Sequence, residues 1–132
     1  ATDGHLQTVP AHGYVYMPGP QHDGPPAGFG MFKSLDGAGF ELWLAAIAPA
    51  WRGNGHGRAM ITAMLTTPAG RMTHLVRVNP QGSHAAAMSH LLGSLGFSAM
   101  AQTTLCTWYL ADRAPLEMAA RIRSAAAAAG TH

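Results

Sequence analysis

The residues in this chain that are best suited to chemistry form a glycine-dense turn, Arg52-Gly53-Asn54-Gly55-His56-Gly57-Arg58. Glycine has no Cβ, so the backbone of such a turn can approach a ligand closely and adopt left-handed conformations. Backbone N–H groups of the turn and of a following helix can then converge on one anion. Arg52 and Arg58 add fixed positive charge at the same place. The turn therefore predicts a site for a phosphorylated ligand.

Two familiar phosphate-binding motifs do not fit this turn. A nucleoside triphosphate loop needs Lys and then Ser or Thr after its last glycine, whereas Gly57 is followed by Arg58 and Ala59. A dinucleotide fingerprint has the form G-x-G-x-x-G, but the glycines here give G-x-G-x-G. The strand expected after the helix, Leu75 to Val78, also lacks an acidic residue for a ribose hydroxyl. A nucleotide-binding protein with a coincidental loop is the faintest of the alternatives.

A third phosphate-binding pattern, Q/R-x-x-G-x-G/A, matches this chain as Arg52-x-x-Gly55-x-Gly57. A second motif follows downstream, where a helix-like stretch from Ser83 ends in Leu95-Gly96-Phe97. With these two motifs the chain resembles the GNAT N-acetyltransferase superfamily over most of its length. The resemblance implies that acetyl-CoA is the cofactor. It also implies that the activity is N-acetyltransfer, in which an amine attacks the acetyl group directly in a ternary complex.

The resemblance further implies where the cofactor lies. In the family, the strand before the glycine loop splays from the next strand, and pantetheine pairs with its backbone, here at Ala46, Ile47 and Ala48. A backbone N–H near Ile47 or Ala48 would stabilise the negative charge that develops on the thioester oxygen. The residues expected to bind the pyrophosphate of coenzyme A are Arg52, Gly53, Asn54, Gly55, His56, Gly57 and Arg58.

Carboxylates that could accept the proton of the attacking amine are scarce, because the chain has only six acidic residues. Glu41 alone falls on the expected central strand, where some family members carry a catalytic glutamate. An apolar setting would raise the pKa of Glu41 into the range useful for a base. The alternative is a carboxylate at the end of the strand that faces solvent.

The later helix lacks two polar residues that the resemblance leads us to expect. The family's usual acid, a tyrosine, falls on Leu92, and its usual asparagine falls on Ala85. His84 and His90 lie on the same helix, so they are the candidates left to transfer protons. The replacements leave an alternative open, a catalytically degenerate GNAT-like module that binds coenzyme A or a partner chain without turnover. Retention of all the glycines in the loop argues against a pure scaffold.

Hydrophobic patterning and turn residues predict the order of elements. Strands are expected at His12–Met17, Phe29–Leu35, Phe40–Ala48 and His74–Val78, with one bent strand or two short ones over Ser98–Leu110. Helices are expected over Ala59–Leu65, from an N-cap at Ser83 to a closing turn at Gly96, and from Pro115 onward. This order predicts an α/β protein, and the resemblance implies a GNAT-like mixed, mostly antiparallel central sheet flanked by helices. The N-terminal strand and helices of the family are expected to be shortened or missing.

The whole chain, residues 1–132, is expected to form one domain, because its length and its hydrophobic content of 48% suit a single core. Most aromatic residues, Trp43 among them, are expected in that core. Tyr14 and Tyr16 are the exceptions, since the resemblance places the first strand and the loop at 18–26 beside the acceptor. The acceptor is expected to be an amine of a small molecule or a peptide. A short acceptor wall also favours a homodimer.

Composition excludes several other classes of function. Charged residues make up 11% of the chain and no block of Lys or Arg occurs, so nucleic acid is not an expected partner. Eight histidines invite a metal site, but none of them form an H-x-x-x-H pair, so no metal is expected. No apolar stretch is long enough to cross a bilayer, and a cytoplasmic location is therefore expected.

Overall fold

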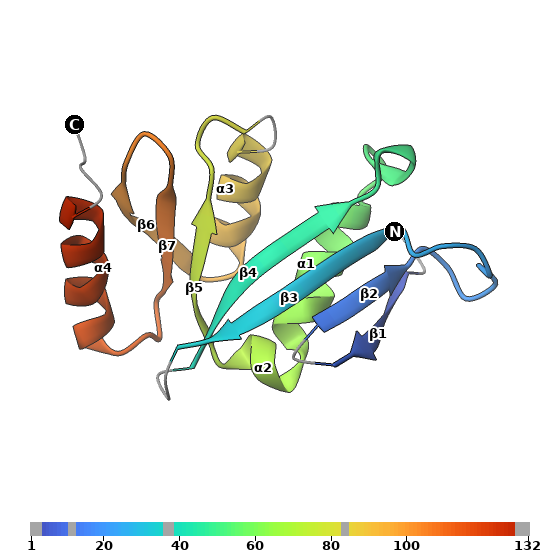
Figure 1. Ribbon diagram of the computed structural model, residues 1–132, viewed down its shortest axis with the longest axis horizontal. Helices are drawn as coiled ribbons and strands as arrows, with labels where there is room; N and C mark the ends of the chain where they lie inside the picture. The colour runs from blue at the N-terminus through green and yellow to red at the C-terminus, as the bar shows by residue number, and fades with distance from the viewer. Residues whose placement is uncertain (1–3, 11–12, 36–38, 83–84, 129–132) are drawn as a thin grey trace. The chain divides into compact units, whose positions relative to one another are not determined.

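The computed structural model describes residues 4–10, 13–35, 39–82 and 85–128. These residues belong to two compact units, Ala1–Thr73 and His74–His132, which are described separately below. Strands and helices occur in both units, and Figure 1 labels them. The α/β class predicted from the sequence is therefore confirmed.

The first unit contains a four-stranded antiparallel sheet (Figure 1). Its strands follow one another in space as they do along the chain, and each pairs with the next. The strands are β1 (His5–Val9), β2 (Gly13–Met17), β3 (Gly28–Ser34) and β4 (Phe40–Ile47). Strand β1 was not expected, and no helix lies among the described residues that precede β4. One short strand, β1, is therefore present in the N-terminal region, where the strand and helices were expected to be shortened or missing.

One face of this sheet is covered by the helix that follows the glycine turn, α1 (His56–Thr66), which contacts β1, β3 and β4. Glycines on β3 allow the helix to come close. A Cβ at Gly28 would collide with the sulfur of Met60, and one at Gly30 would collide with that of Met64. Both methionines are almost completely buried, so this contact forms the core of the unit.

A β-bulge interrupts the pairing of β3 with β4. The register passes from Met31 opposite Leu44 to Phe32 opposite Leu42, so Trp43 is the extra residue. Its side chain is 53% exposed and lies with its ring centre 6.0 Å from Lys33 Nζ. The expectation that Trp43 belongs to the core is therefore wrong, because the bulge turns its side chain out of the packed layer.

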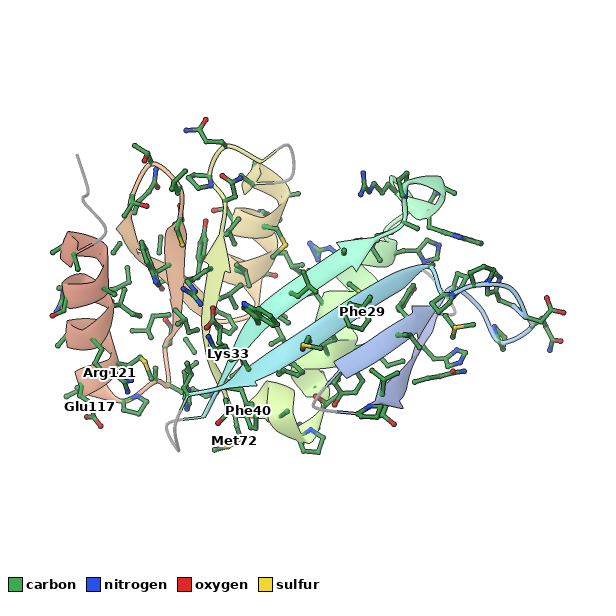
Figure 2. The ribbon with its side chains drawn as sticks, viewed as in Figure 1. Phe29, Lys33, Phe40, Met72, Glu117 and Arg121 are labelled. Carbon is green, nitrogen blue, oxygen red and sulfur yellow. The ribbon has the colours of Figure 1, made fainter. Side chains whose placement is uncertain are left out.

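A short helix, α2 (Pro68–Arg71), follows α1 and was also not expected. Thr67 caps it, since its Oγ1 accepts a hydrogen bond of 3.1 Å from the Gly70 N–H. The chain then returns to the sheet, where the Phe40 N–H donates to the Met72 carbonyl at 2.9 Å. Phe40 and Met72 accordingly lie side by side at the start of β4 (Figure 2).

The second unit contains a three-stranded antiparallel sheet in the order β5-β7-β6. Its strands are β5 (Thr73–Val78), β6 (Phe97–Gln102) and β7 (Thr107–Ala111), and its helices are α3 (Ala85–Ser94) and α4 (Leu116–Ala128). Both helices contact β6. Helix α4 buries Met118, Ile122 and Ala126, which recur every four residues along one face. Glu117 and Arg121 lie one turn apart on its exposed side (Figure 2).

The elements predicted for this unit are largely confirmed. The stretch from Ser98 to Leu110 forms two strands rather than one bent strand. Gly96 ends the turn after α3 with a φ of 87°, a conformation that favours glycine. The predicted N-cap at Ser83 lies outside the described residues. No helix in the described part of the chain is long and apolar enough to cross a membrane.

Candidate cofactor site

The site begins where β4 ends and the chain leaves the sheet. The Ala48 N–H donates to the Ala27 carbonyl at 2.7 Å, so this amide points toward β3. Successive N–H groups of a strand point to opposite edges, and the Ile47 N–H therefore points away from β3. Of the two amides expected to stabilise a thioester oxygen, Ala48 is already bonded within the sheet. Only the Ile47 N–H has the direction that this role requires.

Arg52 spans the turn that follows. A one-turn 3₁₀ helix, η1 (Pro49–Trp51), carries the chain away from β4. The Arg52 Nε then donates to the Ile47 carbonyl at 2.9 Å, which fixes the guanidinium beside the outer edge of the strand. The Arg52 side chain is nevertheless exposed. A positive charge is thus held between the end of β4 and the glycine turn.

The glycine turn ends in the uncovered N-terminus of α1. Gly53 and Gly55 have φ values of 86° and 83°, which other residues rarely adopt. Gly55 is the N-cap of the helix, and no side chain accepts a hydrogen bond there. The first bond along the helix runs from the Ala59 N–H to the Gly55 carbonyl at 3.0 Å. The N–H groups of the residues at 56–58 therefore point out of the helix end, as an anion-binding site needs.

The space around these glycines is open. A Cβ built at Gly53 or Gly55 would meet no heavy atom within 4 Å. A Cβ at Gly57 would meet only Ile47 Cγ1, at an ordinary contact distance of 3.8 Å. The fold itself therefore does not require glycine at position 57. Its absence of a side chain leaves room at the end of the helix for a ligand.

The His56 side chain turns inward from this loop. It is 9% exposed, and its Nδ1 lies 2.8 Å from the Tyr16 hydroxyl of β2. Its imidazole also meets the Trp51 ring edge to face, with 5.5 Å between the ring centres. His56 can therefore offer a ligand its backbone N–H, while its side chain belongs to the interior of the unit.

The two tyrosines expected at the acceptor lie on the face that packs against α1. Tyr16 is completely buried and bonded to His56, so the expectation that it lines an acceptor pocket is wrong. Tyr14 is half-buried and meets Phe32 edge to face at 6.0 Å. The bond between Tyr16 and His56 was missed. Its signal in the sequence is the spacing of His56, Met60 and Met64, which places the imidazole on the inward stripe of the helix.

The structure describes two of the three candidate catalytic residues, Glu41 and His90. Glu41 lies on β4 opposite Lys33 and is 2% exposed, so the alternative of a carboxylate that faces solvent is wrong. His90 is an exposed side chain on α3, and His84 lies outside the described residues. Leu92, at the position of the family's tyrosine, is completely buried. Ala85 is half-buried at the first residue of α3.

His74 is a half-buried imidazole that was not singled out from the sequence. It lies on β5, and its Nδ1 is buried with no hydrogen-bond partner among the described residues. Burial lowers the pKa of His74 below its usual value of 6.5, and the positive charge of Arg113 lowers it further. The folded protein therefore favours the neutral imidazole, and protonation of His74 at acid pH would oppose folding.

Comparison with solved structures shows which fold this is. The diaminobutyrate acetyltransferase EctA from Paenibacillus lautus, in complex with L-2,4-diaminobutyric acid and coenzyme A, aligns with a TM-score of 0.54 at 15% identity, over 76% of this chain and 70% of that chain. A GNAT family acetyltransferase from Elizabethkingia anophelis with acetyl-CoA bound gives 0.54 at 11% identity, over 82% of this chain and 95% of the other. The NatC complex bound to Gag peptide and CoA gives 0.54 at 12% identity, over 74% and 68%. These likenesses confirm the predicted GNAT fold.

Comparison of sequences gives the family. No curated protein sequence matches the chain. The profile of the Acetyltransferase (GNAT) family matches residues 5–97, which include the glycine turn and the Leu-Gly-Phe motif. This match covers more than two thirds of the sequence. It confirms the expected class of enzyme and the expected cofactor, acetyl-CoA. The chain therefore belongs to the GNAT family of acetyltransferases.

Proposed function

We propose that this protein transfers the acetyl group of acetyl-CoA to an amine by direct attack in a ternary complex. The observation that carries the proposal is the N-terminus of α1, which is open, uncapped by any side chain and flanked by arginine. The structural neighbours support it, since those from Paenibacillus lautus and Elizabethkingia anophelis hold coenzyme A or acetyl-CoA. The pyrophosphate would accept hydrogen bonds from the N–H groups at 56–58. The charged side chains of Arg52 and Arg58 would neutralise it.

Pantetheine would continue from this point along the outer edge of β4. The second half of the strand is apolar and exposed, with Leu44 at 42% and Ala45 and Ala46 also accessible. Main-chain pairing with an extended ligand needs no particular side chains, and the strand-edge backbone of Ile47 supplies it. Because the Ala48 N–H is already bonded to the Ala27 carbonyl, the Ile47 N–H is the group that we assign to the thioester oxygen.

The chemical step balances with the groups present. The amine nitrogen attacks the thioester carbon, a C–N bond forms, and the C–S bond breaks to release the thiolate of coenzyme A. One proton must leave the nitrogen and one must reach the sulfur. We assign the first transfer to Glu41, acting through a water because its carboxylate is almost completely buried. His84 or His90 would deliver the second.

The acceptor belongs to the class of amines. EctA is solved with a small diamine acid and NatC with a peptide, so both small molecules and peptides occur among acceptors on this fold. The exposed aromatic ring of Trp43 lies beside the positive charge of Lys33. An apolar surface with a cation beside it suits an acceptor that is not strongly cationic. A single domain over 1–132, a homodimer, a cytoplasmic location and the absence of nucleic acid and membrane partners stay predictions.

A non-catalytic module is the alternative, and the buried position of Leu92 favours it. A completely buried leucine where the family has its tyrosine supplies no proton to a leaving thiolate. Such a module would bind coenzyme A through the same loop and release no product. Binding and turnover therefore have to be measured separately.

The test combines calorimetry with a turnover assay. Acetyl-CoA, ATP and NAD are titrated into the protein, and release of free coenzyme A is followed with a thiol reagent across a panel of small amines and peptide N-termini. We expect saturable binding of acetyl-CoA alone. Binding of ATP or NAD in place of acetyl-CoA would contradict the proposal, and binding without turnover of any amine would favour the module.

A substitution at Glu41 tests the assignment of the base. Glu41→Gln keeps the size of the side chain but cannot accept the proton, so we expect turnover to fall about 100-fold or more while the affinity for acetyl-CoA stays within a factor of two. Glu117→Gln is the matched control, because Glu117 is an exposed carboxylate on α4. Unchanged turnover in Glu41→Gln would remove Glu41 from the mechanism.

A further inference from the structure

Four aromatic rings connect the loop after β2 to the inner side of the glycine turn. His22, in the loop at 18–27, meets Trp51 edge to face with 5.5 Å between the ring centres. Trp51 meets His56 in the same way at 5.5 Å. His56 then contacts Tyr16 both through its ring, at 5.5 Å, and through the 2.8 Å hydrogen bond. The rings come from a loop, from η1, from α1 and from β2, so they join four separate segments of the first unit.

The inner end of this row is sealed from water. Tyr16 has no exposed surface, and His56 has very little. The backbone at Gly4 lies directly against the Tyr16 hydroxyl, since a Cβ at this position would collide with that oxygen. A hydrogen bond in such a setting is stronger than one in water, so loss of either partner removes a favourable buried contact.

The outer end of the row is tied to its own loop. The His22 Nε2 lies 2.7 Å from the Pro25 carbonyl, which orients the imidazole toward Trp51. Trp51 is in turn held by its backbone N–H, which donates to the Ala48 carbonyl at 2.9 Å. The row is therefore anchored at both ends by hydrogen bonds.

The row matters because α1 begins without a side-chain cap. The helix begins at His56, its N-cap is a glycine, and no side chain caps it. One further glycine, Gly53, increases the conformational freedom of the chain that leads into it. A site made of backbone N–H groups binds an anion well only when those groups already converge, since ordering a mobile loop opposes binding. The only side chain in the first turn that is fixed in the interior is that of His56.

We propose that Tyr16 and His56 are a positioning pair that fixes the first turn of α1 in the geometry that binds the anionic part of acetyl-CoA. This inference rests on the proposed function. Neither side chain touches the cofactor in this proposal, because both lie on the inner side of the helix. Their effect passes through the backbone N–H groups of the turn, with Trp51 packed against His56 as the third member of the support.

A double-mutant cycle tests the pair. The variants are Tyr16→Phe, His56→Leu and the combination of both, and acetyl-CoA binding is measured by calorimetry beside the KM and kcat of turnover. We expect each single variant to weaken acetyl-CoA binding about 3- to 10-fold and to raise the KM for acetyl-CoA, with kcat at saturation unchanged. The double variant should lose much less than the product of the two single losses, because both substitutions remove the same hydrogen bond, which can be lost only once.

Tyr109→Phe is the matched control, since Tyr109 is a buried tyrosine on β7 in the second unit. We expect it to bind acetyl-CoA like the unaltered protein. Circular dichroism and thermal unfolding without cofactor show that each variant is folded. If Tyr16→Phe does not fold, His56→Leu gives the decisive comparison, because a leucine there continues the apolar stripe of α1.

The outcomes separate this inference from the proposed function. Failure of the unaltered protein to bind acetyl-CoA overturns the proposed function, and the positioning role falls with it. Normal binding by the unaltered protein together with normal affinity in the single variants overturns the positioning role alone. A fall in melting temperature with unchanged affinity and KM assigns the pair to stability, which also contradicts the proposal.

Discussion

A glutamate at position 57 should make the protein more stable and at the same time lower its affinity for acetyl-CoA. Gly57 lies in the first turn of α1, where a Cβ would meet only Ile47 at an ordinary distance. The backbone there does not have a positive φ, so any residue fits the conformation. Gly57→Glu therefore changes the helix end without straining the fold.

The gain in stability has two sources. Replacing glycine within a helix by a better helix former adds about 0.5 kcal/mol to the free energy of unfolding. A negative charge in the first turn adds about 0.3–1 kcal/mol, because the helix end carries partial positive charge. The sum is about 1 kcal/mol, or about 3–6 °C in melting temperature for a chain of this length.

The loss of affinity follows from the same charge. A carboxylate about 5 Å from a doubly charged pyrophosphate repels it by about 1.7 kcal/mol in a solvent-like dielectric, and by more in a less polar one. A loss of 1.7 kcal/mol corresponds to about 20-fold in Kd. Gly57→Gln carries a side chain of the same size without the charge, so it should show the steric part of the loss alone.

Calorimetry with acetyl-CoA and thermal unfolding without it measure both effects on the same samples. Gly93→Glu is the matched control, because Gly93 lies in α3 with no heavy atom within 4 Å of a built Cβ. It should keep the affinity of the unaltered protein, while its gain from helix propensity is offset by the negative charge in the last turn of α3. If Gly57→Glu binds acetyl-CoA as tightly as the unaltered protein does, the pyrophosphate does not lie at this helix end and the reasoning is refuted.

Two further substitutions test other parts of the fold. Gly55→Ala should lower the free energy of unfolding by about 1–2 kcal/mol, because position 55 has a φ of 83°. Gly93→Ala should raise the free energy of unfolding by about 0.5–1 kcal/mol. Chemical denaturation measures both changes, and changes of the same sign would contradict the assigned backbone geometry. His74 should make the folded protein sensitive to acid. Since its pKa is lowered in the folded state, the unfolded chain binds more protons below about pH 6.5, so stability falls as the pH drops from there toward the folded pKa. Denaturation curves measured between pH 7.5 and 5 should show a smaller fall in His74→Leu, and an identical fall in both proteins would contradict the lowered pKa.

Elements with strong local signals could be predicted from the sequence. Strand β4 is a mostly apolar run that is followed by Pro49, and α1 follows a glycine turn and has methionines at helical spacing. The resemblance carried by the glycine motif and the Leu-Gly-Phe motif then predicted the family and the cofactor, because the residues of each motif are close together in the sequence. Gly96 was found in the same way, since a helix that ends in a left-handed turn favours glycine there.

Features that depend on distant partners could not be predicted. Strand β1 is short, mixes polar and apolar residues, and is recognisable only through its pairing with β2. The bulge that exposes Trp43 arises from the register between two strands, which no local pattern records. The bond between Tyr16 and His56 joins residues 40 positions apart. The helical spacing of His56 shows that it faces inward, but nothing local shows which side chain it meets.

The structure also changes what the glycine motif can be taken to mean. The presence of Gly53, Gly55 and Gly57 together does not by itself argue against a scaffold, because the fold itself explains two of these glycines. Gly53 and Gly55 have positive φ and would be required in any protein that makes this turn. Gly57 has no such requirement, and a side chain there would fit and would stabilise the helix.

A residue that costs helix stability and relieves no clash is best explained by what must lie beside it. Position 57 is open, next to outward-pointing N–H groups, and close to the anchored Arg52. This one glycine and its surroundings therefore support a bound pyrophosphate more strongly than the number of glycines does. A scaffold that no longer bound coenzyme A would gain stability from alanine at position 57. The glycine at position 57 therefore favours a chain that binds the cofactor.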